Sequence, residues 1–271
     1  MRIETKNPDI RITTVSAGDY YTDAGAAMGV LPKAIWKKYL QTDENDTIKM
    51  ALNCLLIQNK NCNILVDTGV GNLLSDKQFK IYRPGHFSLL ENLNELGISR
   101  HDIHHVVFTH LHFDHIGGIL HKDFPNELTF PNAYHHIQKK EWLMATNPNE
   151  LNQAAYPFRE HINVLSDSIR LDIIDGDTEL FPNIHLQLVQ GHSEGMQIVK
   201  IMDQGRAIYY AGDMIPSFLH LSPSVTSAYE LCRKTSYMAK LKILKEVKET
   251  QGLIIMNHDP QKGCINFDEL R

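Results

Sequence analysis

The sequence has no long apolar run. No stretch of its 271 residues approaches the ~20 consecutive apolar residues that cross a bilayer. The first residues also lack the apolar segment of a signal peptide. From these absences we expect a soluble, cytoplasmic protein with no membrane partner.

Cysteine is scarce, and its spacing excludes several kinds of site. The four cysteines are scattered and form no C-x-x-C pair, so zinc ribbons and thioredoxin-like redox motifs are not indicated. We expect reduced, mostly buried thiols. These cysteines are Cys54, Cys62, Cys232 and Cys264.

Positive charge is also in short supply. The chain has 27 Lys and Arg against 32 Asp and Glu, which gives a formal net charge of -5. Binding to nucleic acid rewards clustered basic residues that neutralise phosphates. A mildly acidic chain therefore predicts no nucleic-acid partner.

No Pro/Gly/Ser-rich linker divides the chain, and 42% of its residues are hydrophobic, enough to bury one sizeable core. We expect a single domain over residues 1–271. Short β-branched or apolar runs predict strands, and amphipathic segments predict helices between them. This mixture indicates a layered α/β or α+β fold. The expected strands are 64–66, 106–108, 184–189, 207–210 and 253–256, and the expected helices are 87–96, 229–247 and parts of 137–161.

Histidine is unusually abundant, with 15 residues, and one segment gathers it with aspartate. Residues 109–118 read T-H-L-H-F-D-H-I-G-G. Extended backbone directs residues i and i+2 to the same side, so His110 and His112 can hold one metal ion together. After the turn, Asp114 and His115 point into a neighbouring position. Imidazole and carboxylate donors suit zinc, and this segment predicts metal binding.

A histidine-rich surface loop is the alternative interpretation of this segment. The strand before it and the glycine pair after it favour the metal site instead. His104 and His105 differ from the motif histidines because they precede the strand and break its apolar pattern. We expect both to be solvated surface residues.

Three later residues complete a two-metal arrangement. Two ions ~3.5–4 Å apart can share a hydroxide, and they need a bridging carboxylate and about three further ligands each. Asp213 is the natural bridge because it follows an expected strand. His192 would complete the first site and His258 the second. We expect two Zn²⁺ ions, although these donors also accept manganese, iron or cobalt.

With these residues in view, the chain resembles the metallo-β-lactamase-fold hydrolases over essentially its whole length. T-H-x-H-x-D-H-x-G-G is the defining motif of that superfamily. The resemblance implies an αββα sandwich with the metals at one edge between the sheets. It assigns the first metal to His110, His112 and His192, the second to Asp114, His115 and His258, and the bridge to Asp213. Asp67, in an Asp-Thr-Gly turn, resembles the carboxylate that orients a ligand histidine in this family.

Finer features resemble the N-acyl-homoserine lactonase branch. Residues 24–33 and the segments 141–142 and 147–150 are similar to that branch, whereas 212–216 and 223–226 resemble organophosphate- and ester-cleaving relatives. The lactonases carry a tyrosine three residues after the bridging aspartate, where this chain has Pro216. His220 is either a substitute acid or an ordinary loop histidine. The sequence also leaves open the roles of Tyr20, Tyr21, Tyr156 and Tyr229.

These features predict a metal-dependent hydrolase. We expect a metal-bridging hydroxide to attack an ester or lactone carbonyl, with N-acyl-homoserine lactones as one substrate class. Asp213 would orient the hydroxide and Asp114 would carry a proton to the leaving group. An arylesterase or phosphotriesterase, a glyoxalase II-like thiolesterase and a non-catalytic metal-binding protein remain alternatives. The Met-, Leu- and Trp-containing amino-terminal arm leaves a homodimer open.

Overall fold

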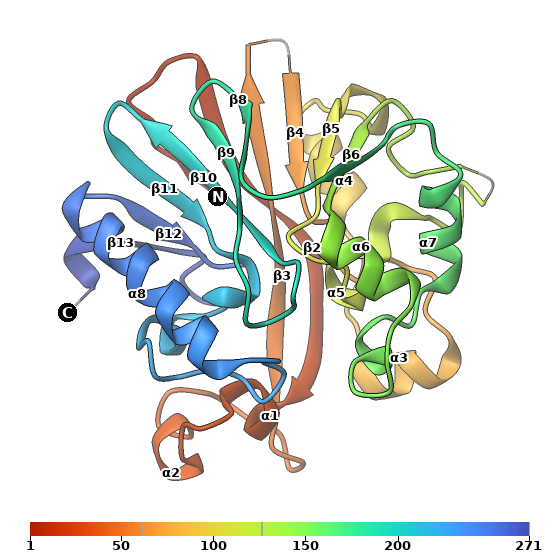
Figure 1. Cartoon of the computed structure of the whole chain (residues 1–271). Helices are drawn as coiled ribbons and strands as arrows, with labels where there is room; N and C mark the ends of the chain where they lie inside the picture. The colour runs from red at the N-terminus through yellow and green to blue at the C-terminus, as the bar shows by residue number, and fades with distance from the viewer. Residues whose placement is uncertain (61, 126, 271) are drawn as a thin grey trace.

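The computed structural model describes residues 1–60, 62–125 and 127–270. Within these residues the strands form two sheets, which lie face to face between outer helices (Figure 1). The first sheet has the strand order β1-β2-β3-β4-β5-β6-β7 and the second β13-β12-β11-β10-β9-β8. The predicted αββα sandwich is therefore confirmed.

The strands of the first sheet are β1 (Arg2–Ile3), β2 (Ile10–Asp23), β3 (Thr47–Asn59), β4 (Cys62–Val66), β5 (His105–Val107), β6 (Tyr134–Gln138) and β7 (Leu171–Ile174). Those of the second are β8 (Thr178–Phe181), β9 (Ile184–Leu188), β10 (Gln197–Asp203), β11 (Arg206–Tyr210), β12 (Leu253–Ile255) and β13 (Cys264–Asn266). Strands β4 to β7 are parallel, and β11 is parallel to β12. Parallel strands are usually covered on both faces, which explains the short apolar runs in β4, β5 and β12.

The helices cover the outer faces of the sheets. Helix α8 packs on the second sheet, whereas α4, α6 and α7 pack on the first (Figure 1). The short α1 and α2 follow the long strand β2. The helix bounds are α1 (Ala24–Met28), α2 (Lys33–Trp36), α3 (Asp76–Tyr82), α4 (Leu89–Glu95), α5 (Phe113–Ile116), α6 (Lys139–Thr146), α7 (Arg159–Ser166) and α8 (Arg233–Glu249). The 3₁₀ turns are η1 (Arg100–Asp102), η2 (Gly117–Ile119), η3 (Gln153–Ala155), η4 (Gly212–Met214), η5 (Phe218–Leu221) and η6 (Phe267–Glu269).

Successive strand residues enter different apolar cores. Ile64 and Val66 face the core between the two sheets, whereas Leu65 faces the core beneath α4, α6 and α7. In the second sheet, Tyr210 faces the inter-sheet core and Tyr209 packs toward α8. This alternation follows from the two-residue repeat of a strand. It leaves the strand ends, rather than their interiors, available for polar side chains.

Several local expectations need correction. The helix expected over 229–247 begins only at Arg233, because the preceding residues form a loop whose polar side chains make tertiary contacts. His104 is exposed as expected, but His105 is half-buried within β5, where its Nδ1 lies 2.8 Å from Nε2 of His136.

All four cysteines are free, as expected, yet only Cys54 of the four is buried. None of the helices formed by the described residues is long and apolar enough to cross a membrane.

Candidate metal centre

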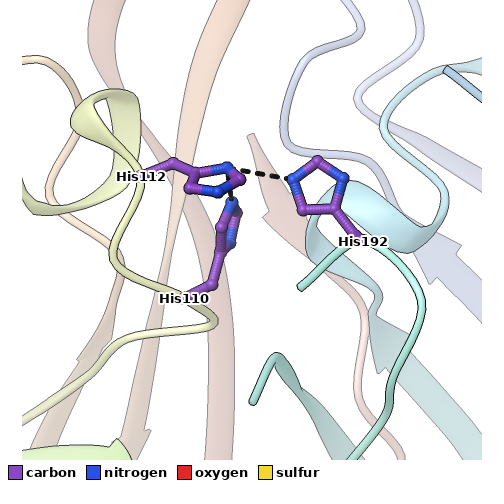
Figure 2. A group of neighbouring side chains, drawn as sticks. All are labelled: His110, His112 and His192. Carbon is purple, nitrogen blue, oxygen red and sulfur yellow. Dashed lines mark hydrogen bonds between the residues drawn. The ribbon is translucent and has the colours of Figure 1, made fainter. Parts of the chain in front are cut away.

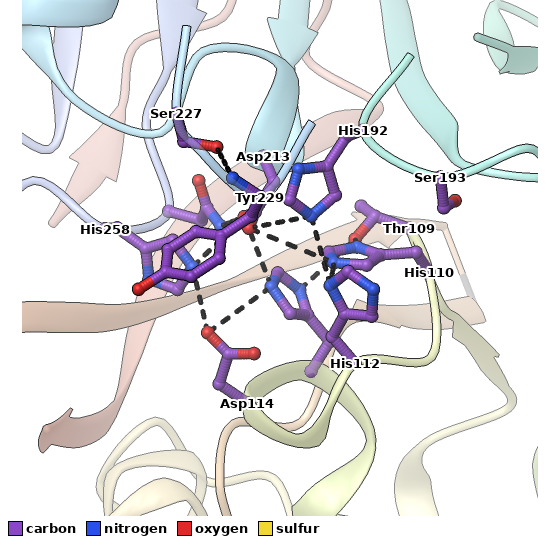
Figure 3. Close-up of polar contacts among 12 residues, drawn as sticks. Thr109, His110, His112, Asp114, His192, Ser193, Asp213, Ser227, Tyr229 and His258 are labelled. Carbon is purple, nitrogen blue, oxygen red and sulfur yellow. Dashed lines mark hydrogen bonds and ion pairs between the residues drawn. The ribbon is translucent and has the colours of Figure 1, made fainter. Parts of the chain in front are cut away.

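Polar side chains gather where strands of both sheets end. Residues 110–115 follow β5, and His192, Asp213 and His258 follow β9, β11 and β12. Because β10 is antiparallel to both β9 and β11, strands β9, β11 and β12 run in the same direction. Their carboxyl ends therefore meet at one edge of the second sheet, opposite the 110–115 loop (Figure 3).

The first group consists of three histidines (Figure 2). Nε2 of His110 lies 3.0 Å from Nδ1 of His112, which in turn lies 3.1 Å from Nε2 of His192. Their ligand atoms lie within 4.8 Å of one another, as required for atoms that share one cation. The extended backbone at His112 brings its ring beside that of His110, so the expected i, i+2 pairing is present.

The second group consists of Asp114, His115 and His258. Nε2 of His258 lies 3.3 Å from Oδ2 of Asp114, and Nε2 of His115 lies 3.8 Å from the same oxygen. Asp114 and His115 belong to the single-turn helix α5, and His258 follows β12. The turn into α5 separates His110 and His112 from Asp114 and His115. The first pair therefore belongs to the first group and the second pair to the second group.

Asp213 lies between the two groups. Its Oδ2 is 3.4 Å from Nε2 of His192, on the side of the first group. Its Oδ1 is 3.2 Å from Nε2 of His115 and 3.1 Å from Nε2 of His258, on the side of the second. One carboxylate therefore faces both groups, one oxygen to each (Figure 3).

These residues fit divalent cations. Nε2 of His115 and Nε2 of His258 are buried and make no hydrogen bond with any described residue, although both face carboxylate oxygens. An unpartnered buried polar atom is costly and is expected to have a ligand. Borderline metals such as zinc accept imidazole and carboxylate donors together.

Burial and mutual proximity perturb the site electrostatically. Burial, together with the neighbouring histidines, lowers the pKa of His110 and His112 well below the ordinary value. Burial opposes protonation of His115 too, but the carboxylates around it, Asp67 first, raise its pKa well above the ordinary value. Burial opposes ionisation of Asp213, yet the histidines around it hold its pKa well below the usual range. Opposite charges on imidazoles and carboxylates thus offset part of the cost of burying these groups in the site.

Glycines 117 and 118 let the metal-binding loop approach the chain after β4. Gly117 has an ordinary helical φ of -56°, so it is not needed there for its conformational freedom. Space is the actual constraint: a Cβ at Gly117 would lie 2.2 Å from the carbonyl oxygen of Val70, and one at Gly118 2.2 Å from that of Thr68. Side chains at these positions would therefore push Asp114 and His115 away from the site.

Asp67 lies behind the second group, against His115. Its Oδ2 is 2.9 Å from Nδ1 of His115, and its Oδ1 accepts a hydrogen bond from the Thr109 amide at 2.8 Å. Asp67 has a left-handed backbone (φ 59°), which is uncommon outside glycine and persists where surrounding contacts fix it. The carboxylate orients the ring of His115 and anchors the strand end that carries the motif.

Two buried glutamates near the site were missed from the sequence. Oε1 of Glu230 lies 3.3 Å from Nδ1 of His192, and its side chain is 2% exposed. Glu141 accepts hydrogen bonds from the Leu111 amide at 2.9 Å and from the Ser193 hydroxyl at 2.5 Å. Glu141 thus ties together the loops that carry His110, His112 and His192. Glu141 belongs to the lactonase-like segment 141–142, but nothing in the sequence indicated these contacts, and Glu230 stands in no local motif.

His220 and Pro216 lie on the loop after Asp213. The Nδ1 of His220 is 2.8 Å from the Ser217 hydroxyl, and its Nε2 is 3.1 Å from the Ala27 carbonyl oxygen. Burial lowers the pKa of His220 to about 3. Both ring nitrogens are therefore engaged within the protein, which favours the interpretation of His220 as a structural loop histidine. Pro216 accepts a hydrogen bond from the His258 amide at 3.0 Å through its carbonyl.

The αββα sandwich and the histidine–aspartate site at its edge define a metal-dependent hydrolase. The family model of the metallo-beta-lactamase superfamily matches residues 50–250, and the chain belongs to this superfamily. It is therefore an enzyme, a metallo-hydrolase whose clustered side chains are suited to divalent metal.

Its relatives include lactonases. The chain is 26% identical over 235 residues to the N-acyl homoserine lactonase AiiA of Bacillus thuringiensis subsp. kurstaki, covering 80% of this chain and 85% of the relative. A probable metal-dependent hydrolase from Staphylococcus aureus has a similar structure, with a TM-score of 0.90 and 27% identity over 99% of this chain and 96% of that one. The dizinc quorum-quenching lactonase AidC, bound to its product, has a TM-score of 0.76 at 24% identity, covering 97% and 92%. This last likeness shows the fold alone.

Proposed function

We propose that this chain is a dinuclear metal-dependent hydrolase that cleaves an ester or lactone, with N-acyl-homoserine lactones as the first substrates to test. The position of Asp213 carries the proposal, because its two oxygens face two different groups of ligand atoms. A site for one ion would not need a carboxylate shared in this way.

In this proposal His110, His112 and His192 hold one cation, Asp114, His115 and His258 hold the other, and Asp213 bridges them. Two Zn²⁺ ions are our first assignment, with manganese, iron and cobalt as the alternatives. Bound there, two divalent cations would supply a hydroxide nucleophile near neutral pH and polarise the carbonyl.

The protein side chains fix this arrangement. Asp213 sets the separation of the two groups and orients the nucleophile between them. Asp114 receives a hydrogen bond from the Tyr20 hydroxyl at 2.7 Å on its Oδ2, which holds the carboxylate toward His258. Transfer of a proton to the leaving group by Asp114 stays a prediction. No serine or cysteine nucleophile is required.

The similarity to N-acyl homoserine lactonases supports lactones as substrates. A second candidate function is that of an arylesterase or phosphotriesterase. It is supported by Pro216, which stands where the lactonases carry a tyrosine. Aryl leaving groups depart without help from a proton donor. We also propose that residues 1–271 act as one domain, since the ligands come from both sheets. The cytoplasmic location and a homodimer stay predictions from the sequence.

The test compares metal content and turnover. We expect about two metal ions per chain by elemental analysis, with hydrolysis of N-hexanoyl-homoserine lactone. His110→Ala and Asp213→Ala should each lose bound metal and at least ~10³-fold in kcat/KM, because each removes a donor from the centre. His86→Ala, at an exposed histidine away from the site, is the matched control.

Full hydrolysis by a demonstrably metal-free enzyme would refute the proposal. Turnover of paraoxon or p-nitrophenyl acetate without lactone cleavage would favour the second candidate. Metal binding without turnover of any of these substrates would contradict ester and lactone hydrolysis as the activity.

A further inference from the structure

Tyr229 belongs to a loop that joins the metal centre to the amino-terminal arm. The next residue, Glu230, contacts the ring of His192. On the other side, the Ala228 amide donates to the carbonyl of Ala26 at 2.8 Å, and the Tyr229 amide donates to the Ser227 hydroxyl at 3.2 Å. The backbone at Tyr229 is thus held at a fixed place beside the centre.

The side chain of Tyr229 lies beside the centre, and its hydroxyl is directed toward Thr22 rather than into the two ligand groups. Figure 3 shows its ring on the side of His258 and Asp114. Its hydroxyl lies 3.0 Å from the Thr22 hydroxyl, and 48% of the residue is exposed. Thr22 and Tyr20 are two residues apart on β2 and therefore point to the same face of that strand. The Tyr20 hydroxyl contacts Asp114, so the Tyr229 hydroxyl meets the same face of β2 at the neighbouring position on that face, beside the second group.

Neighbouring tyrosines are committed to other contacts. The Tyr20 hydroxyl donates to Asp114 within the buried site, and the Tyr156 hydroxyl donates to Glu141 at 2.8 Å. Tyr82 stacks its ring on Phe113, with the ring centroids 4.0 Å apart. Tyr229 differs from Tyr20 and Tyr156 because its hydroxyl is paired with another hydroxyl at the exposed rim, so it can turn to an incoming molecule.

We propose that Tyr229 is a catalytic residue whose hydroxyl donates a proton to the leaving alkoxide of the ester or lactone. This inference rests on the proposed function. It gives the reaction a proton donor that does not depend on Asp114, whose Oδ2 already accepts a hydrogen bond from Tyr20. Burial raises the pKa of Tyr229, and the carboxylates of Asp23, Asp114 and Asp213 add to that effect, so the phenol keeps its proton near neutral pH.

The proton transfer balances within the hydrolysis. As the tetrahedral adduct collapses, the carbon–oxygen bond to the leaving group breaks and its electron pair stays on the leaving oxygen. That oxygen takes the phenolic proton and becomes an alcohol, because an alkoxide is more basic than a phenolate. The exposed Tyr229 phenolate then recovers a proton from bulk water. A nitrophenolate leaving group is a weak base and needs no such donor.

The experiment uses this dependence on the leaving group. Wild-type holoenzyme, Tyr229→Phe and the matched control Tyr82→Phe are assayed on N-hexanoyl-homoserine lactone and on p-nitrophenyl hexanoate. We expect Tyr229→Phe to lose ~100-fold or more in kcat on the lactone and less than about threefold on the aryl ester. Bound metal per chain should equal that of the wild type. Tyr82→Phe should change the two rates by the same small factor.

Equal losses of Tyr229→Phe on the two substrates, or unchanged lactone turnover, would overturn the inference while leaving the proposed function standing. A lactone-selective loss in Tyr82→Phe instead would also overturn it. Wild-type holoenzyme that cleaves neither substrate would overturn the proposed function, and this inference with it.

Discussion

Single side chains that contact the clustered histidines from the side opposite the site determine the orientation of their rings. Each of the two groups contains one histidine backed by a carboxylate: His115 by Asp67 and His192 by Glu230. The ring of His258 is oriented differently, since its Nδ1 lies 2.8 Å from the Ala51 carbonyl oxygen. A carboxylate behind a ligand histidine fixes its tautomer and strengthens it as a donor. The affinity of each group for metal should therefore respond to a different residue.

Glu230→Gln tests this at the first group. The amide keeps the shape but loses the charge that favours the Nδ1–H tautomer of His192. We expect ~10- to 100-fold weaker binding of one of the two metal ions, with the other unchanged. Competition with a chromogenic chelator measures the two affinities.

Glu246→Gln provides the control, because Glu246 is bonded to Lys200 and Tyr209 rather than to a ligand histidine. Equal weakening of both ions in Glu230→Gln, or the same loss in the control, would contradict the assignment.

Sequence alone could predict which histidines and aspartates cluster, because their signal is local. Residues 110–115 combine chemistry and spacing in one short segment, and the later histidines follow strand-like runs. Glu230 and Glu141 carry no such signal, since a glutamate in a helical pattern is normally a solvated residue. Only the tertiary structure shows that they are buried against His192 and Ser193. The same holds for Tyr229, which the sequence could not separate from the other tyrosines.

Among the elements, strand β6 contains a buried histidine that should make stability depend on pH. His135 is fully buried, and neither ring nitrogen hydrogen-bonds to a described residue. Burial, with help from His136 and Arg170, lowers its pKa from 6.5 to about 3. Because the folded pKa lies below the unfolded one, the unfolded chain binds the proton first as the pH falls. The free energy of unfolding should therefore decrease from pH 6.5 down to about 3.

His135→Phe should remove this contribution. While wild-type His135 stays neutral in the fold, the loss of stability per pH unit grows from about 0.7 kcal/mol at pH 6.5 toward about 1.4 kcal/mol near pH 5. We expect the difference in unfolding free energy between variant and wild type to shift in favour of the variant by that amount as the pH falls. Urea unfolding at several pH values between 6.5 and 5 measures it, with the exposed His86→Phe as control. A difference that stays constant with pH would exclude the assigned role.

The bounds of helices and strands could be predicted where a hydrophobic repeat dominates the sequence. The prediction failed where tertiary contacts decide the local structure. The helix expected over 87–96 is observed as α4 (Leu89–Glu95), and the strands near 64, 184, 207 and 253 are present. The amphipathic pattern from 229 extends through residues that do not join α8, because Tyr229 contacts Thr22 of β2 and Glu230 contacts His192. His105 lies within β5 because pairing with His136 compensates for its polarity. Local sequence propensity contains no information about the contact of Glu230 with His192 or that of His105 with His136.

At the scale of the whole molecule, the metal centre spans the seam between the two sheets. The first-sheet loop contributes His110 to His115, and the second-sheet loops contribute His192, Asp213 and His258. Backbone bonds reinforce the same seam, since the Asn53 amide of β3 donates to the Asn257 carbonyl at 2.9 Å. Metal bound there should hold the two halves together.

Removing the metal should therefore lower the melting temperature. A cation that binds only the folded state at ~100 times its Kd adds about 2.7 kcal/mol, which corresponds to about 5–10 °C for a chain of this size. We expect prolonged dialysis against a chelator to cause this loss and added Zn²⁺ to reverse it, measured by calorimetry. Asp213→Ala, which lacks the shared carboxylate, should respond much less. Equal melting of metal-free and metal-loaded wild type would contradict the prediction.

The wide separation of the ligands along the chain has a consequence for biosynthesis. The first group is complete in sequence once His192 has been translated, but the second waits for His258, which follows helix α8 and strand β12. A growing chain therefore has no complete second group until α8, β12 and His258 have left the ribosome. In the proposed dinuclear site, loading of the second group would accordingly come late, after the second sheet has closed onto the first.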